Sequence, residues 1–174
     1  MWVLYANTTP GSAPDNFGGT PSGNLDWTRN TTNALNNVSD FLLDKSATDE
    51  QGEGVYYEFD IQNGDKTVMQ LLQFLKLDSS AYVDGDIGIF LVTSSDNFVA
   101  SFNVIRPANE DMLAGVPSVF KQFQFNSTDT KARLCIHIAS INGSAYTVQF
   151  NDFQLGRSPV ATSAAVFDMG EYTP

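Results

Sequence analysis

Cysteine, histidine and basic side chains are all scarce in this sequence. A single cysteine, Cys135, excludes an internal disulfide framework and a cysteine-rich zinc site. Lys and Arg number 9 against 20 Asp and Glu, which leaves a formal charge of -11. An acidic chain repels phosphate backbones and anionic lipid headgroups, so we expect neither a nucleic-acid partner nor attachment to an anionic membrane surface.

Long apolar runs and charged residues are also in short supply. No apolar stretch approaches the roughly 18 residues that a membrane-spanning helix needs, so we expect no membrane insertion. Charged residues make up only 17% of the chain, and its polar surface must therefore come largely from Asn, Gln, Ser and Thr. Hydrophobic residues make up 42% of the 174 residues, which is enough to form the core of one domain and excludes global disorder.

Recognisable catalytic signatures are missing from the sequence. His137 lies two residues after Cys135, but side chains so spaced on a strand stand about 7 Å apart and point in parallel. No nucleophile elbow, HExxH, P-loop or dinucleotide fingerprint occurs. The grouped carboxylates Glu53, Glu58 and Asp60 are one arrangement that a glycosidase could use, although acidic residues commonly cover the solvent face of a strand. We therefore predict a protein that is not an enzyme.

Clusters of Gly, Asn and Ser divide the sequence into short apolar runs, a pattern typical of an all-β domain. In segment 54–61 apolar and polar residues alternate, which should turn its odd-numbered residues toward a core and Tyr56 toward solvent. Segment 67–77 is apolar on both parities; a helix is the alternative there, but the context favours a central strand covered on both faces. The other strands are expected at 25–29, 39–45, 86–93, 102–106, 119–126, 131–139 and 146–155.

About ten short strands without an amphipathic helix predict an all-β fold, a single jelly-roll-like β-sandwich. The residues Asn142, Gly143 and Ser144 form a turn signal that should join the last two strands as a hairpin. Small residues predominate from 158 onward, which predicts a flexible C-terminal linker. We therefore expect the sandwich over 1–157, followed over 158–174 by this linker and the start of a further module.

Four aromatic residues are candidates for binding a sugar. Tyr56 lies on the polar side of its strand with Tyr57 beside it, and Trp27 and Tyr82 lie in or beside loops. A pyranose ring stacks its apolar face on an aromatic ring, while amides and carboxylates take its hydroxyls. The alternative interpretation is that these rings fill the ends of the sandwich.

Acidic loops make calcium the best candidate for a bound metal ion. Oxygen-rich loops suit hard cations, and two such stretches are Asp44–Glu53 and Asp84–Asp86. Neither stretch has the spacing of a known calcium loop, so no required cofactor is predicted from them.

Three segments resemble phage tail-fibre and related virion proteins. They are PDNFGGTP at 14–21, FLLDKSATDEQGEGVYYEFDI at 41–61 and AYTVQFNDFQL at 145–155. The resemblance extends over nearly all of 2–157, and FDMGEYTP at 167–174 is similar to the opening of a further module in such fibres. These virion modules are in turn similar to the β-sandwich carbohydrate-binding modules of xylanases and cellulases.

The resemblance implies a non-enzymatic structural or adhesion module on a virion surface, in a tail fibre, a head fibre or a capsid decoration. Its partners would be further copies of the chain in a homotrimer, other virion proteins and host-surface glycans, which multivalent display would bind by avidity. The alternatives are a dedicated carbohydrate-binding module or lectin of a secreted enzyme and, third, a glycosidase domain. The closing Asp-Asp-x-x-Leu signature of such modules aligns with 151–155, which implies a structural calcium at Asp152.

Overall fold

The computed structural model describes residues 1–32, 40–61, 67–76, 81–99, 101–108, 117–126, 128–157 and 165–168. Apart from the short 3₁₀ helix η1 (Ser94–Asp96), the regular elements of this part of the chain are β-strands. The strands are β1 (Trp2–Ala6), β2 (Leu25–Asn30), β3 (Asp40–Lys45), β4 (Glu53–Asp60), β5 (Thr67–Lys76), β6 (Ile87–Thr93), β7 (Ser101–Ile105), β8 (Pro117–Gln124), β9 (Lys131–Ile138), β10 (Tyr146–Arg157) and β11 (Ala165–Asp168).

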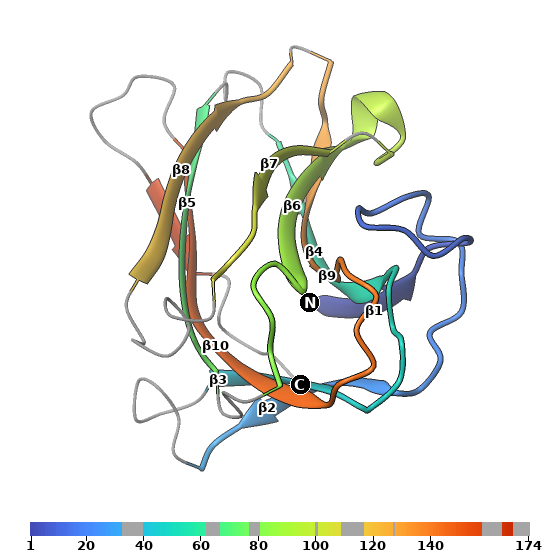
Figure 1. Cartoon of the computed structure of the whole chain (residues 1–174). Coiled ribbons are helices and arrows are strands. Elements are labelled where there is room, and N and C mark those ends of the chain that lie inside the picture. Colours follow the sequence, from blue (N-terminus) through green and yellow to red (C-terminus); the bar gives the residue numbers. More distant parts are fainter. Residues whose placement is uncertain are drawn as a thin grey trace.

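Two antiparallel sheets pack face to face and curve in the same sense (Figure 1). Sheet A has the strand order β1-β4-β9-β6-β7, and sheet B has the order β2-β3-β10-β5-β8, with β11 paired to β10. Strands β4, β5 and β6 alternate between the two sheets, and so do β7, β8, β9 and β10. Strands β6 and β7 are neighbours in sheet A. This is the predicted jelly-roll-like β-sandwich.

Inward-facing side chains of both sheets form the core. Val55 is fully buried, and Tyr57 and Phe59 of the same strand pack against the core cluster, whereas Tyr56 and Glu58 lie on the other face. The alternation predicted for 54–61 is therefore confirmed. Burying a large aliphatic or aromatic side chain contributes about 1.5–3 kcal/mol, so the inner faces supply most of the stabilisation. Other fully buried members of the core are Leu43, Ile87, Ile89, Leu134, Ile136, Val148 and Phe150.

The turn signal at residues 142–144 does not close a hairpin, and that prediction is wrong. Strand β9 pairs with β4 and β6 in sheet A, whereas β10 pairs with β3 and β5 in sheet B. The turn carries the chain from one sheet to the other because each of these two strands already has a partner on both sides.

Segment 67–76 is the strand β5, and it lies inside sheet B between β10 and β8, as predicted. Strand β1 has no counterpart among the predicted strands. Strand β11 extends sheet B beyond residue 157 by pairing with the end of β10. Residues 158–164 and 169–174 lie outside the described residues, so the division of the chain at 157 stays a prediction.

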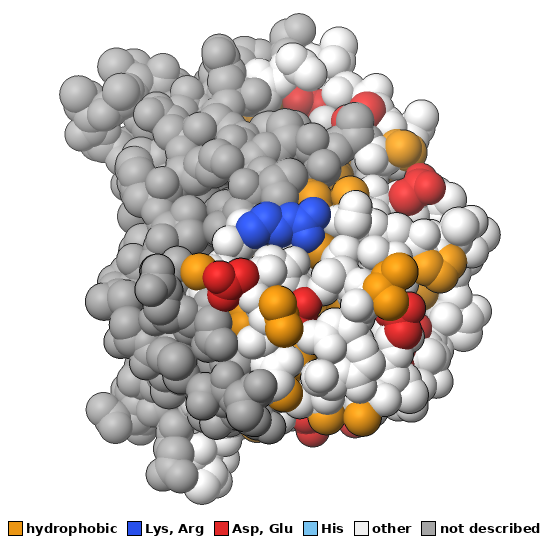
Figure 2. All heavy atoms as spheres, in the orientation of Figure 1, with side chains coloured by type: hydrophobic (Ala, Val, Ile, Leu, Met, Phe, Trp, Pro, Cys, Tyr) orange, Lys and Arg blue, Asp and Glu red, His pale blue; other side chains and the backbone are white. Residues whose placement is uncertain are grey.

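The segment between β1 and β2 lies on the outer side of sheet A (Figure 1). In the coloured part of Figure 2, acidic (red) and apolar (orange) side chains are scattered, and basic atoms (blue) form one group near the centre. No helix in the described part of the chain is long and apolar enough to cross a membrane.

Candidate functional site

The outer face of sheet A carries a row of aromatic and charged side chains. Directly opposite residues in an antiparallel pair share a face of the sheet. Tyr56 of β4 lies opposite Cys135 of β9, which in turn lies opposite Phe90 of β6. One row further along, Glu58 lies opposite Arg133. A second, smaller apolar cluster therefore forms on this face, apart from the core between the sheets.

Three aromatic rings surround the guanidinium of Arg133. The Arg133 Cζ atom lies 4.0 Å from the ring centroid of Phe98 and 4.6 Å from those of Phe17 and Tyr56. Arg133 Nε also donates a 2.9 Å hydrogen bond to Glu58 Oε2. A cation held over a ring in a partly desolvated site contributes up to about 2 kcal/mol. We call Phe17, Tyr56, Glu58, Phe98 and Arg133 the Arg133 cluster.

Both phenylalanines of the cluster have a left-handed backbone. The φ angles are +48° and +53° at Asn16 and Phe17, and +59° and +63° at Asn97 and Phe98. Asparagine adopts this conformation with little penalty, whereas a bulky aromatic residue rarely does and stores about 1–2 kcal/mol of strain. Two turns from distant parts of the chain thus direct strained phenylalanines onto the same arginine. Strain of this kind is common where a structure holds a binding site in shape.

Charged groups border the cluster on one side. Lys131 Nζ donates to Glu58 Oε1 at 2.8 Å and lies 3.6 Å from Asp60 Oδ1. The hydrogen bond from Lys131 is the largest cause of a lowered pKa at Glu58, and Arg133 adds to it. Glu58 is therefore ionised at neutral pH and can accept further hydrogen bonds from a ligand's hydroxyl groups.

A second group of polar contacts connects β1 and the segment 7–24 that follows it to the same face. The Tyr5 hydroxyl lies 2.7 Å from His137 Nδ1, and His137 Nε2 lies 2.9 Å from the Gly11 carbonyl oxygen. Because a carbonyl can only accept, His137 Nε2 donates to Gly11, and Nδ1 accepts from Tyr5. Burial lowers the pKa of His137 to about 4, and the nearby Arg106 acts in the same direction. The imidazole is therefore neutral at pH 7.

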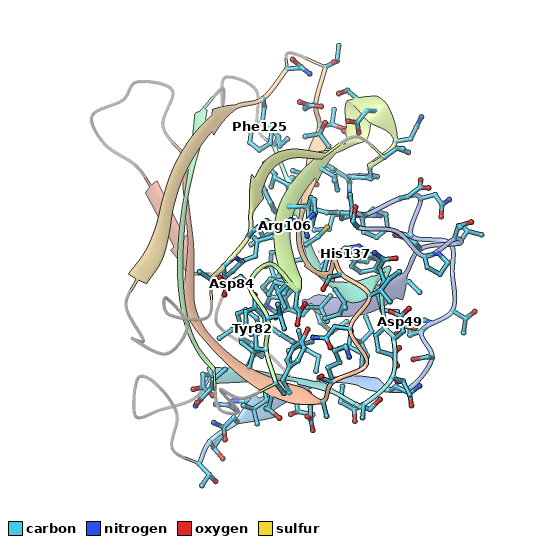
Figure 3. The ribbon with its side chains drawn as sticks, viewed as in Figure 1. Asp49, Tyr82, Asp84, Arg106, Phe125 and His137 are labelled. Atoms are coloured by element: carbon cyan, nitrogen blue, oxygen red, sulfur yellow. The ribbon has the colours of Figure 1, made fainter. Side chains whose placement is uncertain are left out.

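Arg106 holds the same N-terminal segment from another side. Its Nη2 donates to the Ser12 carbonyl oxygen at 3.0 Å, and its guanidinium lies 5.3 Å from the ring centroid of Phe90. His137, labelled in Figure 3, lies on the side of sheet A that faces this segment. The segment 7–24 between β1 and β2 is thus fixed across one part of the face, and Phe17 within it completes the Arg133 cluster.

The four aromatic residues that were predicted to bind sugars are not brought together. Of these, Tyr56 is the one that the structure places in the Arg133 cluster, where it is half-buried. The Trp27 ring stacks on Phe41 with centroids 5.1 Å apart and also contacts Trp2, whose ring lies 5.7 Å from that of Tyr57. Trp27 and Tyr57 therefore pack against the core.

Tyr82 is buried at the end of the sandwich. Only 2% of its surface is exposed, and its hydroxyl donates a 2.9 Å hydrogen bond to the Pro107 carbonyl oxygen. Its ring also makes an edge contact with Tyr146 at 5.4 Å. The alternative interpretation, in which aromatic rings fill the sandwich, describes Tyr82 because both its ring and its hydroxyl are already engaged.

The acidic loops use their carboxylates for internal hydrogen bonds. Ser22 Oγ donates to Glu50 Oε2 at 2.6 Å, and the Ser22 backbone N–H donates to Glu53 Oε1 at 2.8 Å. Asp86 accepts from the backbone N–H of Val83 at 3.0 Å. In the described part of the chain, no group of three or more His, Cys, Asp or Glu residues is arranged to hold a metal ion.

The calcium prediction at Asp152 stays a prediction. Asp152 lies in β10 where the register with β5 shifts between Asn151 and Gln154, and its side chain lies outside what the structure describes.

Sequence reasoning did not single out Arg133, Phe17 or Phe98. The arginine is the third residue of β9, and the two phenylalanines are 81 positions apart in the sequence. One local signal does mark them, because the triplet Asp-Asn-Phe occurs at 15–17 and again at 96–98. Asn tolerates the left-handed region, so each triplet is a plausible turn, but their convergence depends on the tertiary fold.

Comparison with protein-family models and with curated proteins gives no match for this chain. Among solved structures, the chain is similar to a CBM4 module with 17% identity and a TM-score of 0.53, covering 90% of this chain and 94% of that one. It is also similar to the CBM22-1 xylan-binding domain from Paenibacillus barcinonensis Xyn10C, with 8% identity, a TM-score of 0.52 and coverage of 91% and 95%. Identities this low show the fold alone, which is a β-sandwich of the carbohydrate-binding-module type.

Proposed function

We propose that this domain is a non-catalytic carbohydrate-binding module that holds a glycan chain at the Arg133 cluster. The observation that carries the proposal is the convergence of Phe17, Tyr56 and Phe98 around Arg133 on the outer face of sheet A. Sugar sites combine aromatic surface with a few fixed polar groups, and the cluster has both. The fold shared with carbohydrate-binding modules supports the same function.

In this proposal the rings of the cluster stack on the sugar, and the charged groups form hydrogen bonds with its hydroxyls. A half-buried ring such as Tyr56 or Phe98 offers apolar surface to the C–H face of a pyranose. Glu58 accepts hydrogen bonds from sugar hydroxyls, and the exposed Lys131 next to it donates them. The rings are pinned by Arg133, so little side-chain entropy is lost when a sugar stacks on them.

The binding test measures the affinity of the purified chain for soluble polysaccharides, starting with xylan, and for a glycan array. Tyr56→Ala should weaken binding at least about tenfold, which corresponds to about 1.4 kcal/mol for one stacked ring. The matched control is Ile141→Ala, which removes a 75% exposed apolar side chain from the loop that follows β9. Arg133 lies near the beginning of that strand, so this control leaves the cluster intact.

Two outcomes would contradict this function. One is equal, unselective binding to all glycans, and the other is binding that Tyr56→Ala and Ile141→Ala weaken to the same extent. The absence of catalysis has its own test, because Glu58 is the carboxylate of the Arg133 cluster. Robust hydrolysis of a polysaccharide that disappears in Glu58→Gln would make the domain an enzyme.

We further propose that the module is displayed on a phage virion surface as a homotrimer beside other virion proteins, where many weak glycan contacts add up by avidity. This proposal rests on the sequence resemblance of 14–21, 41–61 and 145–155 to virion modules. Sedimentation of the purified chain tests it, and a monomer at high concentration would contradict the trimer. Labelling of particles with an antibody to this chain would test the location.

A further inference from the structure

Lys45 ends in a cage of backbone carbonyl oxygens. Its Nζ atom lies 2.6 Å from the oxygen of Asn142, 2.7 Å from that of Thr48, 3.0 Å from that of Ser144 and 3.2 Å from that of Ser46. Only 1% of the residue is exposed. A lysine is rarely buried so completely, and here each carbonyl points its negative end at the same nitrogen.

The number of acceptors indicates the charged form of Lys45. An ammonium has three N–H donors and a neutral amine has two, so four surrounding carbonyl oxygens match the ammonium better. The Tyr146 ring adds a fifth contact, with its centroid 5.4 Å from Nζ. Burial lowers the pKa of Lys45, whereas negative charge on Glu50, Asp86 and Asp49 acts in the opposite direction and favours the cation. Asp49, labelled in Figure 3, marks this end of the sandwich.

The cage connects two distant stretches of the chain. Ser46 and Thr48 follow β3 directly, whereas Asn142 and Ser144 belong to the turn that carries the chain from β9 in sheet A to β10 in sheet B. The ammonium therefore fastens the crossing between the sheets to the end of β3. Without a cation, the four carbonyl oxygens would face one another without this shared donor.

The distances distinguish between kinds of cation. Calcium binds oxygen at about 2.3–2.6 Å and magnesium at about 2.0–2.1 Å, whereas an N⁺–H donor binds an oxygen at about 2.7–2.9 Å. The four N···O distances of 2.6–3.2 Å spread around the ammonium range, and three of them exceed the distances of either metal.

We propose that the Lys45 cage is a binding site for a primary ammonium ion, which the protein fills with its own side chain and which accepts a free alkylammonium ion when that side chain is shortened. The proposal is independent of glycan binding, because the cage and the Arg133 cluster involve different residues.

Chemical rescue of Lys45→Ala tests the proposal. Alanine removes three methylene groups and the ammonium, which n-propylammonium restores. We expect the variant to melt on the order of 10 °C below the wild type, because four carbonyl oxygens lose the ammonium donor and the buried aliphatic part of Lys45 leaves a cavity. With 100 mM n-propylammonium chloride and a dissociation constant of about 10 mM, the melting temperature should recover by roughly 3–5 °C. Tetramethylammonium chloride at the same concentration carries the charge but no N–H donor and should give no such recovery.

Two control variants complete the test. Lys131→Ala removes an ammonium whose side chain is 48% exposed, and n-propylammonium should stabilise it no more than tetramethylammonium does. Lys45→Met keeps an apolar side chain in the cage, so it should remain destabilised and should not respond to n-propylammonium. If Lys45→Ala does not fold at all, the readout becomes its soluble yield on refolding with and without n-propylammonium.

The proposal is overturned by equal effects of the two ammonium salts on Lys45→Ala, whether in melting temperature or in refolding yield. Wild-type stability of Lys45→Met would also overturn it, because the cage would then need no cation.

Discussion

Arg133 shows how one side chain can organise a whole surface of this protein. The guanidinium contacts rings from three separate segments and one carboxylate of the neighbouring strand. A lysine in its place would be a point charge without the planar donors that a ring and a carboxylate can share. Its removal should therefore loosen both turns that carry the phenylalanines.

Replacement of this arginine should destabilise the fold more than replacement of its neighbour. We expect Arg133→Met to lower the free energy of unfolding by about 2 kcal/mol, because three rings and Glu58 lose a partly desolvated partner. The control is Lys131→Met, whose ammonium forms an exposed ion pair with the same Glu58, and it should differ little from the wild type. Urea unfolding midpoints measure both effects, and equal losses in the two variants would contradict the role given to Arg133.

His137 should make the free energy of unfolding depend on pH between pH 5 and pH 7, which is above the ordinary pKa of a carboxyl group. Its pKa is about 4 in the folded state against an ordinary value of 6.5, so the unfolded chain binds more protons between these values. The contribution of His137 is complete above pH 6.5 and is lost as the pH falls toward 4. Between pH 7 and pH 5 the loss should be about 2 kcal/mol. Urea unfolding at pH 5, 6 and 7 measures it.

The variant His137→Gln provides the comparison for this pH dependence. Glutamine can still donate to Gly11 and accept from Tyr5 but does not titrate. Its stability should change less between pH 7 and pH 5 than that of the wild type. The same slope in both proteins would show that other groups cause the pH dependence.

At the scale of elements, sheet A is shaped by glycines on either side of His137. Gly54 of β4 and Gly88 of β6 are its direct cross-strand partners. A Cβ atom at Gly54 would lie only 2.2 Å from the Ile136 carbonyl oxygen, and one at Gly88 would lie 2.4 Å from the ring of Phe90. The missing side chains allow close packing around His137.

Gly54→Ala should therefore destabilise the sandwich by about 3 kcal/mol or more, because the clash involves backbone that cannot move without breaking the β4–β9 pairing. Gly143→Ala is the matched control, since a Cβ atom at Gly143 meets nothing within 4 Å. Thermal unfolding compares the two. A Gly54→Ala protein as stable as Gly143→Ala would mean that the strands separate at little cost.

The whole molecule carries a formal charge of -11 with few cations to balance it. Within the residues that the structure describes, the salt bridges involve Glu58 and Asp60 on one side and Lys131 and Arg133 on the other. Added salt should thus weaken the repulsion among the acidic side chains more than it weakens the attraction within these few ion pairs. We expect the melting temperature to rise by roughly 2–5 °C between 0.02 and 0.3 M NaCl. A fall in melting temperature over this range would contradict that balance.

The melting temperature of the whole protein also tests for calcium, with ionic strength held constant. An increase in melting temperature with CaCl₂ that a chelator reverses, and that Asp152→Asn abolishes, would support the calcium predicted at Asp152. No shift would exclude a stabilising site. The ammonium of Lys45 occupies its own carbonyl cage in either case.

The all-β fold and the orientation of β4 could be predicted from the sequence, because both follow from local patterns. Alternating residues place Tyr57 and Tyr56 on opposite faces of a strand whatever lies around it. Short apolar runs between turn residues predict strands for the same reason. The resemblance of 14–21, 41–61 and 145–155 to virion modules, and through them to carbohydrate-binding modules, is consistent with the sandwich that the structure has.

Which residues far apart in the sequence contact one another was decided only by the tertiary structure. Residues 142–144 carry a turn signal whether the next strand lies in the same sheet or the opposite one, and strand order settles which. Phe17, Phe98 and Arg133 meet because sheet pairing brings two turns to one face, and Lys45 meets Asn142 because β3 pairs with β10. Local sequence determines which way a side chain points along its strand, but long-range strand pairing determines what it meets there.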